Sequence, residues 1–429
     1  MQRILSTDLS TRTGEPVRLA GWVHRRRLLK SVAFLVLRDA AGLAQVVVTE
    51  PAARAALAAL TEESVVAVAG TVRANPAAPG GVEVVDPTIE ALTDPAEAPP
   101  FDLYRPRLTA ALPTVLDSAY LALRHPRRRA VHEVSAAAVA GFRSALSERR
   151  FVEVHTPKIV ASATESGANV FGVDYFGRPA YLAQSPQFYK QMLVGVFERV
   201  YEVGPVFRAE PHDTVRHLAQ YTSLDAELGF IEDHRDVMAM ARDAVAGMLG
   251  AVAAQAGAAL RLLDLALPEV PARIPEIRFP DALELVGAEP DEPDLAPAHE
   301  RALGEWARRE HGSELLFVTA YPMAKRPFYT HPEPGRPGLS RSFDLLFRGV
   351  ELATGGQRRH RYGDYVAALA ERGEHDLAPY AGYLDTFRHG MPPHGGFAIG
   401  LERFVARLVG AANVREVTLF PRDLSRLTP

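Results

Sequence analysis

The feature that most constrains the fold is a succession of short strand-like segments in the first quarter of the chain. Between Val17 and Asp94, apolar and polar residues alternate in stretches bounded by turn-forming residues, as is typical of half-buried β-strands. The stretches are VRLAGWVHRRR, VAFLVLRD, LAQVVVTE, SVVAVAGTVRA and GVEVVDPTIEAL, with the Ala-rich helical segment PAARAALAALT between the third and the fourth. This layout predicts an oligonucleotide-binding (OB) barrel over residues 1–95, although another small β-barrel would have the same strand count.

The length and composition favour a folded protein of two domains. The chain has 429 residues, which is too long for a single hydrophobic core of ordinary size. Hydrophobic residues make up 47% of it and charged residues 23%, as in folded soluble proteins. Its formal net charge of -4 gives no overall attraction to nucleic acid, so such binding would need local patches. Cysteine is absent, which excludes disulfides, thiolate nucleophiles and thiolate zinc sites. Neither a signal sequence nor a membrane-spanning window is evident, so we expect a cytoplasmic protein.

A proline-punctuated stretch separates the barrel from the rest of the chain. Prolines between positions 95 and 113 interrupt any periodicity and predict a hinge linker over residues 96–130. A second domain over residues 131–429 would begin with an amphipathic helix through Ala136–Arg150. Within it, residues 232–315 combine an Ala-rich helix with Pro- and acid-rich turns and show no recognisable chemistry, so we expect an insertion or a peripheral helical layer there.

The segment FRAEPHDTVRHLAQYTSLDAELGF concentrates charged residues in a predicted β-hairpin. Both of its ends have strand composition, and residues 211–220 would form the connecting loop. Alternation would place Arg208 and Glu210 on one face of the first strand. The loop and the second strand add His212, Arg216, His217, Tyr221, Ser223, Asp225 and Glu227. This mixture suits a polyanion held beside cationic groups, while a solvated outer face is the alternative.

The segment SFDLLFRGVELATGGQRRH predicts a second hairpin that carries two carboxylates. If Arg348–Gly349 forms the turn, Asp344 pairs with Ala353 and lies diagonally from Glu351, at about 7–8 Å on the same face. That separation suits carboxylates that approach Mg²⁺ around a triphosphate, with Thr354 as a further oxygen ligand. Two exposed acids on a surface hairpin would give the same pattern.

A glycine-rich strand, HGGFAIG, leads directly into the amphipathic helix LERFVARLVG. Without side chains at Gly395, Gly396 and Gly400, a flat group could lie against the backbone, with Arg403 stacked on it. Glycine followed by a helix is weak support for such a site by itself.

A polar helix is predicted in YLAQSPQFYKQMLVGVFERV, starting at the cap Ser185–Pro186. Gln187, Lys190 and Gln191 would share one face of this helix, where a lone lysine is usually solvated. Upstream, Glu165 lies in the small-residue loop ATESGANVFGV, which could be a mobile lid or simply a turn.

Together and in this order, these segments resemble the class II aminoacyl-tRNA synthetases, and specifically the aspartyl-tRNA synthetases of the archaeal type. The resemblance covers essentially the whole chain: FVEVHTPKIV is similar to the first class signature, VFRAE with SLDAE to the second, and GFAIGLERF to the third. The signatures are individually loose, but their joint occurrence with TESGANVF and QSPQFYKQ is specific.

The resemblance implies an α+β protein with an antiparallel catalytic sheet flanked by helices and an anticodon-binding barrel. Such enzymes use ATP and Mg²⁺, with no zinc expected, to convert L-aspartate to aspartyl-adenylate and then pass the aspartyl group to tRNA. The family is homodimeric, and Pro157 would lie at the dimer interface. A membrane partner is not expected.

The resemblance also assigns roles to residues. For ATP it implies contacts from Arg208, Glu210, Arg216, His217, Leu218, Tyr221, Glu351, Gly400 and Arg403, with Arg208, Glu210 and Arg403 as catalytic residues. For Mg²⁺ it implies Asp344, Glu351 and Thr354. For aspartate it implies Glu165, Ser185, Gln187, Lys190, Asp225, Thr354 and Arg358, with Lys190 and Arg358 neutralising the side-chain carboxylate. For the anticodon it implies His24, Arg27, Phe34, Gln45 and Pro76.

Two departures from the family pattern are present. Gln220 stands where the family generally has Glu, so the contact made by that acid is in doubt. ELATGG replaces a form that usually contains Ser, so Thr354 could be a poorer or differently placed metal ligand.

Two rival functions fit much of the same pattern. Asparaginyl-tRNA synthetases share the class and most signatures, but they generally lack the lysine found here as Lys190. A non-catalytic paralogue that only binds nucleic acid would have no reason to retain Arg208, Glu351 and Arg403.

The choice of tRNA is a separate question. His24 and Pro76 are the residue types of relaxed members that charge both tRNA-Asp and tRNA-Asn, so we expect the relaxed activity. A surface histidine and a turn-forming proline are the plain alternatives.

Overall fold

The computed structural model of the chain describes residues 1–162, 169–211 and 214–429. Two compact units are present, Met1–Ala111 and Leu112–Pro429, and each is described by itself. The division falls inside the stretch predicted as a linker, but helices α2, α3 and the start of α4 already occupy residues 112–130.

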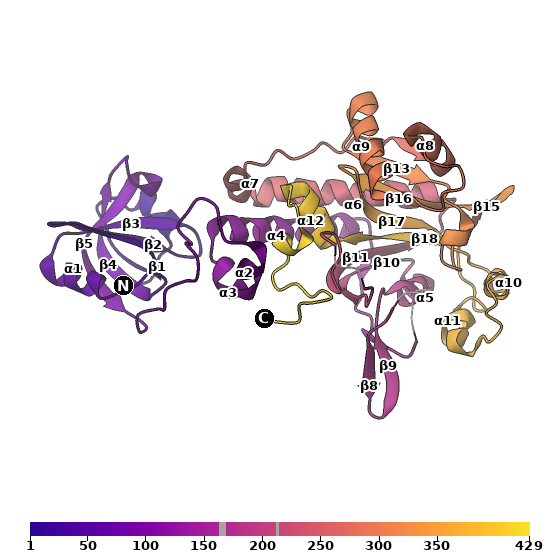
Figure 1. Ribbon diagram of the computed structural model, residues 1–429, viewed down its shortest axis with the longest axis horizontal. Helices are drawn as coiled ribbons and strands as arrows, with labels where there is room; N and C mark the ends of the chain where they lie inside the picture. The colour runs from indigo at the N-terminus through magenta and orange to yellow at the C-terminus, as the bar shows by residue number, and fades with distance from the viewer. Residues whose placement is uncertain (163–168, 212–213) are drawn as a thin grey trace. The chain divides into compact units, whose positions relative to one another are not determined.

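The first unit is a closed five-stranded barrel with strand order β1-β2-β3-β5-β4, which confirms the predicted OB-type barrel (Figure 1). Its elements are β1 (Pro16–Leu28), β2 (Ala33–Arg38), β3 (Leu43–Val48), α1 (Pro51–Ala58), β4 (Val65–Ala74) and β5 (Val82–Ala91). Alternate side chains such as Leu19, Leu35 and Val46 point inward and are buried. The period-two pattern of the sequence therefore becomes a separate hydrophobic core within the barrel.

The second unit is built on an eight-stranded sheet with strand order β12-β13-β16-β17-β18-β11-β10-β6. Pairing is antiparallel except for β12 with β13 and β6 with β10. The strands are β6 (Val152–Glu153), β10 (Arg199–Phe207), β11 (Gln220–Gly229), β12 (Glu276–Arg278), β13 (Leu315–Thr319), β16 (Ser342–Phe347), β17 (Val350–Gln357) and β18 (His394–Gly400). Smaller sheets are formed by β7 (Ile159–Val160), β8 (Gly172–Tyr175) and β9 (Arg178–Leu182), and by β14 (Pro332–Glu333) and β15 (Arg336–Ser340).

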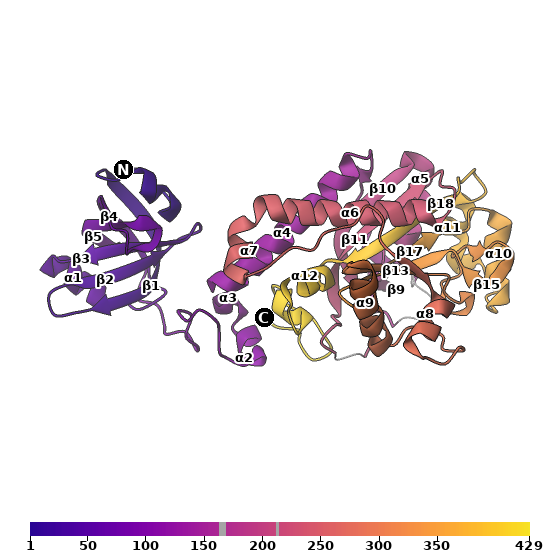
Figure 2. The same cartoon turned by 90° about the horizontal axis from the view of Figure 1, so that it is seen from above.

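Helices flank this sheet, as predicted for an α+β catalytic domain. They are α2 (Leu112–Asp117), α3 (Ala119–Ala122), α4 (Pro126–Ser147), α5 (Gln187–Phe197), α6 (His234–Gln255), α7 (Gly257–Leu263), α8 (Phe279–Val286), α9 (Pro297–His311), α10 (Tyr362–Glu371), α11 (Ala381–Thr386) and α12 (Leu401–Val409). The long helices α4 and α6 lie side by side in both views (Figure 1 and Figure 2). Their apolar faces pack with the sheet into the main core of the unit.

The position of α6 corrects the expectation that residues 232–315 form only an insertion or a peripheral layer. Val237, Ala241, Val245 and Met248 of α6 are buried in the main core. The helix is also long and apolar enough, by length and composition, to cross a membrane, contrary to the expectation from the sequence. Its hydrophobicity has a different cause here, because its buried face packs against α4 and against strands of the sheet.

Candidate active site

The first predicted hairpin is formed by β10 and β11. The strands pair in antiparallel register, with Val206 opposite Tyr221. Arg208 and Glu210 lie beyond the end of β10, rather than on a strand face as predicted. The backbone N–H of Arg208 still donates to Ala219 O at 2.9 Å, so the base of the connecting loop is fixed. His212 lies outside the described residues.

A pocket of about 190 Å³ lies between this hairpin and the start of α12. Arg208 lies with its guanidinium carbon 5.7 Å from the centre of the Tyr221 ring, and it lies 4.0 Å from the Glu210 carboxylate. The predicted ATP residues that line the pocket are Arg208, Glu210, Arg216, His217, Leu218, Tyr221, Gly400 and Arg403. An aromatic ring and four basic side chains thus surround one opening, a composition that suits a purine with attached phosphates.

Glu351 does not line that pocket but is tied to it through Arg403. The Arg403 guanidinium donates to the backbone oxygen of Glu351 at 3.0 Å and to its carboxylate at 3.1 Å. Burial acts to raise the pKa of Glu351, but the positive charges of Arg403, Arg326 and Arg208 outweigh this effect. The pKa is therefore lowered. The carboxylate is therefore ionised at neutral pH.

The register of the second hairpin differs from the prediction at one step. Leu346 pairs with Glu351, but a bulge between Leu345 and Leu346 shifts the remaining pairs, so that Asp344 lies opposite Thr354 instead of Ala353. The extra residue in β17 brings the Thr354 hydroxyl to 3.4 Å from the Glu351 carboxylate. The sequence pattern did not indicate this bulge.

The donor set around Asp344 fits Mg²⁺. Asp344 pairs with Arg326 at 3.1 Å through one oxygen, while its other oxygen is buried without a hydrogen-bond partner among the described residues. Burial raises the pKa of Asp344 in the absence of a cation. The described residues contain no cluster of three or more His, Cys, Asp or Glu, so a hard cation would need phosphate oxygens in addition to Asp344, Glu351 and Thr354.

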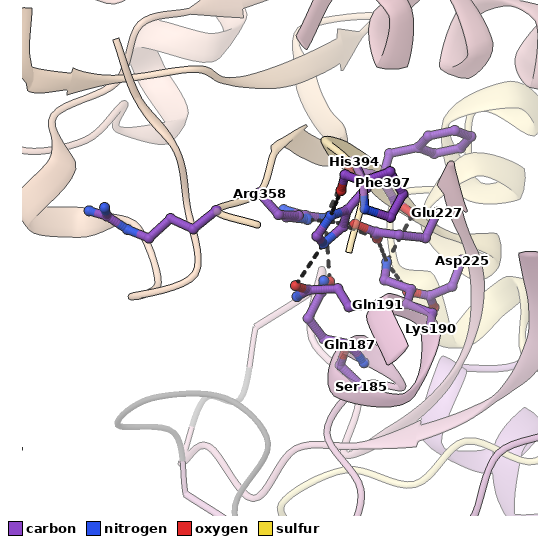
Figure 3. Close-up of polar contacts among 12 residues, drawn as sticks. Ser185, Gln187, Lys190, Gln191, Asp225, Glu227, Arg358, His394 and Phe397 are labelled. Atoms are coloured by element: carbon purple, nitrogen blue, oxygen red, sulfur yellow. Dashed lines mark hydrogen bonds and ion pairs between the residues drawn. The ribbon is translucent and has the colours of Figure 1, made fainter. Parts of the chain in front are cut away.

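A buried ionic cluster joins the predicted amino-acid residues from three elements (Figure 3). Lys190 of α5 donates to Asp225 of β11 at 2.9 Å and lies 3.4 Å from Glu227. Arg358, just after β17, donates to Glu227 at 3.0 Å and to the Gln187 side-chain oxygen at 3.3 Å. Lys190 is 2% exposed and Glu227 fully buried, so the two cations meet on one desolvated carboxylate.

Glu227 is the centre of this cluster, although the sequence indicated only that it shares a strand face with Asp225. Burial alone would raise its pKa, but the positive charges of Arg358 and then Lys190 hold the pKa below its usual value. The Nε2 atom of Gln187 is buried without a hydrogen-bond partner among the described residues. Ser185 accepts the Gln187 N–H at 3.0 Å and fixes the start of α5. Glu165 lies outside the described residues.

A group of uncharged polar side chains, formed by Gln191, Tyr365, Tyr383 and His394, lies next to the cluster. The Gln191 side-chain oxygen accepts from Tyr365 and Tyr383 at 2.9 Å each and lies 3.1 Å from His394 Nε2. Burial lowers the pKa of His394 to about 4, so the ring is uncharged at neutral pH. Except for Gln191, this group was not predicted, because tyrosines in a helix pattern resemble ordinary core residues.

The glycines of β18 serve a different purpose from the one predicted. A Cβ at Gly396 would lie 2.0 Å from Glu227 Oε2, and one at Gly395 would lie 2.7 Å from Val237. Protein atoms therefore occupy the space beside both positions. Of these three glycines, only Gly400 lines the pocket between the first hairpin and α12.

Glu300 of α9 was missed by sequence reasoning. Its carboxylate accepts from the Glu351 backbone N–H and from Arg216, both at 3.2 Å. Burial raises its pKa, against the backbone hydrogen bond from Glu351. The segment predicted to carry no chemistry thus holds two predicted ATP residues in place.

In the barrel, the predicted anticodon residues divide into two environments. Phe34 on β2 lies opposite Arg27 on β1, and Gln45 donates to Glu83 at 3.0 Å. His24 is buried rather than a surface residue: its Nδ1 lies 3.1 Å from an Arg38 nitrogen and its ring packs edge-on against Tyr104. Pro76 is exposed in the connection after β4.

Pro157, expected at a dimer interface, is exposed in the connection between β6 and β7. Val152 of the sheet-edge strand β6 is also exposed. This surface is open in the single chain.

Comparison with known proteins identifies the same two regions. The family "tRNA synthetases class II (D, K and N)" matches residues 112–424, and "OB-fold nucleic acid binding domain" matches residues 17–92. The chain is 46% identical to the aspartate–tRNA(Asp/Asn) ligase of Thermus thermophilus, with full coverage of both chains. The corresponding ligase of Deinococcus radiodurans is also 46% identical, over 100% of this chain and 99% of that protein.

A solved structure supports the fold assignment. The asparaginyl-tRNA synthetase of Pyrococcus horikoshii complexed with asparaginyl-adenylate superposes with a TM-score of 0.92 at 30% identity and full coverage of both chains. The barrel, the sheet with its clustered signature residues and these matches over the full length agree, and the chain belongs to the class II tRNA synthetases of the D, K and N group.

Proposed function

We propose that this chain is an aspartate–tRNA ligase that activates L-aspartate with ATP and transfers it to tRNA-Asp and tRNA-Asn. The observation that carries the proposal is the buried pairing of Lys190 and Arg358 around Glu227. Relatives at 46% identity carry the name of this activity. The fold alone does not distinguish aspartate from asparagine, because an asparaginyl-tRNA synthetase has the same architecture.

In the first step, an α-carboxylate oxygen of aspartate would attack the α-phosphorus of ATP, and the bond to pyrophosphate would break. Arg208 would stabilise the negative charge that develops on the α-phosphate, and Glu210 beside it would contact the adenine or the tRNA end. Tyr221 and Arg403 would hold the adenine ring between them. Arg216 and His217 would bind the outer phosphates.

Mg²⁺, when bound, would neutralise phosphate charge during this step. Asp344, Glu351 and Thr354 are the residues that would hold it, and the partnerless Asp344 oxygen supports this assignment. In the second step, the terminal ribose hydroxyl of tRNA would attack the aspartyl carbonyl, and AMP would leave.

Selection of aspartate over asparagine follows from hydrogen-bond chemistry more than from net charge. Asp225 and Glu227 already neutralise Lys190 and Arg358, so a bound asparagine would not leave these two cations unpaired. Lysine and arginine side chains can only donate hydrogen bonds. The amide nitrogen of asparagine would place a donor against these donors, whereas both oxygens of aspartate accept.

The test is ATP–pyrophosphate exchange with each amino acid. We expect strong exchange with aspartate and little with asparagine. Exchange that depends on asparagine alone would eliminate the substrate assignment.

The relaxed choice of tRNA is tested by charging purified tRNA-Asp and tRNA-Asn. The proposal is supported by the names of the relatives and by the presence of His24 and Pro76. We expect both tRNAs to accept aspartate with comparable kcat/KM. Rejection of tRNA-Asn by several orders of magnitude would remove this part of the proposal without affecting the exchange reaction.

We further propose a homodimer that buries the surface around Pro157. The exposed edge strand β6 and the exposed Pro157 support this placement. Light scattering coupled to size-exclusion chromatography should give twice the mass of the 46.7 kDa chain.

A further inference from the structure

An arginine-rich groove lies next to the ATP pocket, between α9, the turn that joins β16 to β17, and α12. Its volume is about 540 Å³, and its lining includes five arginines against two glutamates. The arginines are Arg216, Arg301, Arg308, Arg348 and Arg407. Of these five arginines, only Arg216 is among the proposed ATP-binding residues.

Close backbone contact forms one wall of the groove. A Cβ at Gly304 of α9 would lie 2.5 Å from the Cα of Gly349, and Gly349 has a positive φ of 68° that favours glycine. Only two glycines allow this approach of helix to turn. Arg301 and Arg308 are seven residues apart on α9, so they lie on the same helix face, about 10 Å apart along the axis.

The charges of the groove are incompletely compensated. Arg348 pairs with Glu314 at 2.9 Å and Arg216 pairs with Glu300 at 3.2 Å. By contrast, Arg301, Arg308 and Arg407 have no ion pair with any residue in the described ranges.

Arg407 is the most buried of these three arginines. It follows Arg403 by one turn of α12 and is partly buried. Burial, and then the positive charges of Arg216, Arg348 and Arg403, lower its pKa, while Glu300 acts in the opposite direction. An anion placed between these side chains would relieve the repulsion among their positive charges.

The groove lies beside the ATP pocket, and Arg216 lines both. The second reaction step must bring the 3′ end of tRNA to the ATP pocket, and the chain of backbone phosphates leads to that end. Arginines spaced along a groove are suited to such a chain, because each of them can contact a different phosphate.

We propose that Arg301, Arg308 and Arg407 bind backbone phosphates of the tRNA acceptor arm. The inference rests on the proposed function, since it takes tRNA as the substrate. Pyrophosphate is the other phosphate source, and the experiment separates the two. The contacts are independent of base sequence, so tRNA-Asp and tRNA-Asn would be bound alike.

The test uses the full-length protein with Arg301→Gln/Arg308→Gln and Arg407→Gln. The control is Arg309→Gln on the same helix, because Arg309 is 68% exposed, pairs with Glu310 and does not line the groove. We measure the KM for tRNA in aminoacylation, tRNA binding by filter retention without ATP, and aspartate-dependent ATP–pyrophosphate exchange. Normal exchange by the variants shows that the catalytic unit is folded.

We expect the double variant to raise the KM and Kd for tRNA about tenfold, and to reduce the salt dependence of binding by about one unit of log Kd per log salt for each arginine. Exchange and the KM for pyrophosphate should match those of the control. Unchanged tRNA binding in both groove variants would overturn the proposal, and so would a rise in the KM for pyrophosphate without a change in tRNA binding. If the wild type showed no aspartate-dependent exchange, the proposed function would fail first, and this inference with it.

Discussion

At the residue scale, Glu227 organises the buried ionic cluster that we propose binds the amino acid. It is fully buried and accepts from Arg358 at 3.0 Å while it lies 3.4 Å from Lys190. A buried carboxylate between two cations fixes the direction of both donors, at a desolvation cost that only this pairing offsets. Removing one member of such a group leaves the others buried and unpaired.

We therefore expect Lys190→Met to reduce kcat/KM in aspartate-dependent exchange by a factor on the order of 10² to 10³. The control is Lys158→Met, which removes a lysine that pairs with Glu202 at 2.7 Å and forms no ion pair with Asp225 or Glu227 in the described ranges. Comparable losses in the two variants would show that the effect is one of general stability. Retention of full activity by Lys190→Met would refute the assigned role.

His394 makes the stability of the catalytic unit dependent on pH. Its pKa in the folded protein is about 4, below the ordinary value of 6.5, so the unfolded state binds a proton more readily between these values. Keeping His394 uncharged in the folded state therefore stabilises the protein fully above pH 6.5, and this stabilisation is lost as the pH falls towards 4. At pH 5 the loss should be about 2 kcal/mol.

Urea unfolding of the wild type and of His394→Gln at pH 7 and pH 5 measures this term. The variant should lose less stability between the two pH values than the wild type does. Parallel pH dependences would contradict the assigned cause.

At the element scale, β18 lies between β11 and β17 and, apart from His394 at its start, supplies backbone rather than side chains to the site. Ala226 pairs with Phe397 and Glu227 with Gly396 in the adjacent strand β11. A Cβ at Gly396 would meet both Glu227 Oε2 at 2.0 Å and the Ala226 backbone oxygen at 2.2 Å. Only glycine therefore fits at this position of the strand.

Gly396→Ala should lower the free energy of unfolding by at least about 1–3 kcal/mol and displace Glu227. Gly382→Ala on α11 is the matched control, because nothing lies within 4 Å of a Cβ there. The control should be neutral or slightly stabilising. Thermal unfolding measures the loss of stability, and aspartate-dependent exchange measures the effect of displacing Glu227. Equal stability and equal exchange in the two variants would exclude the steric explanation.

At the scale of the whole molecule, the barrel and the catalytic unit have separate hydrophobic cores. The residues that we propose bind the amino acid belong to the second unit, while Phe34 and Gln45 lie on strands of the first. Substitutions on the barrel face should therefore change tRNA recognition and leave amino-acid activation intact.

We expect Phe34→Ala to raise the KM for tRNA about tenfold or more, since stacking on an aromatic ring contributes about 1–3 kcal/mol per base. ATP–pyrophosphate exchange should remain at the wild-type rate. Leu92→Ala, which removes an exposed apolar side chain directly after β5, serves as the control. A loss of exchange in Phe34→Ala would show that the units are not independent.

The sequence alone determined the local elements of this protein. Alternation along residues 17–94 predicted the five barrel strands, and the hairpins at Arg199–Gly229 and Ser342–Gln357 followed from strand composition and turn residues. Such patterns are local, because the side-chain period of a strand is fixed by its own backbone. The resemblance of short signatures then predicted Lys190, Arg358 and the pocket residues.

The tertiary structure decided what depends on contacts between distant segments. The sequence could not indicate that Glu227 joins Lys190 to Arg358, that Glu300 of α9 reaches Arg216 and Glu351, or that neighbouring side chains fill the space beside Gly395 and Gly396. No periodicity records such pairings, because they form only when strands and helices far apart in the chain pack against one another. The direction in which a charged side chain points is therefore settled by packing, whereas its position on a strand or helix is settled by its neighbours in sequence.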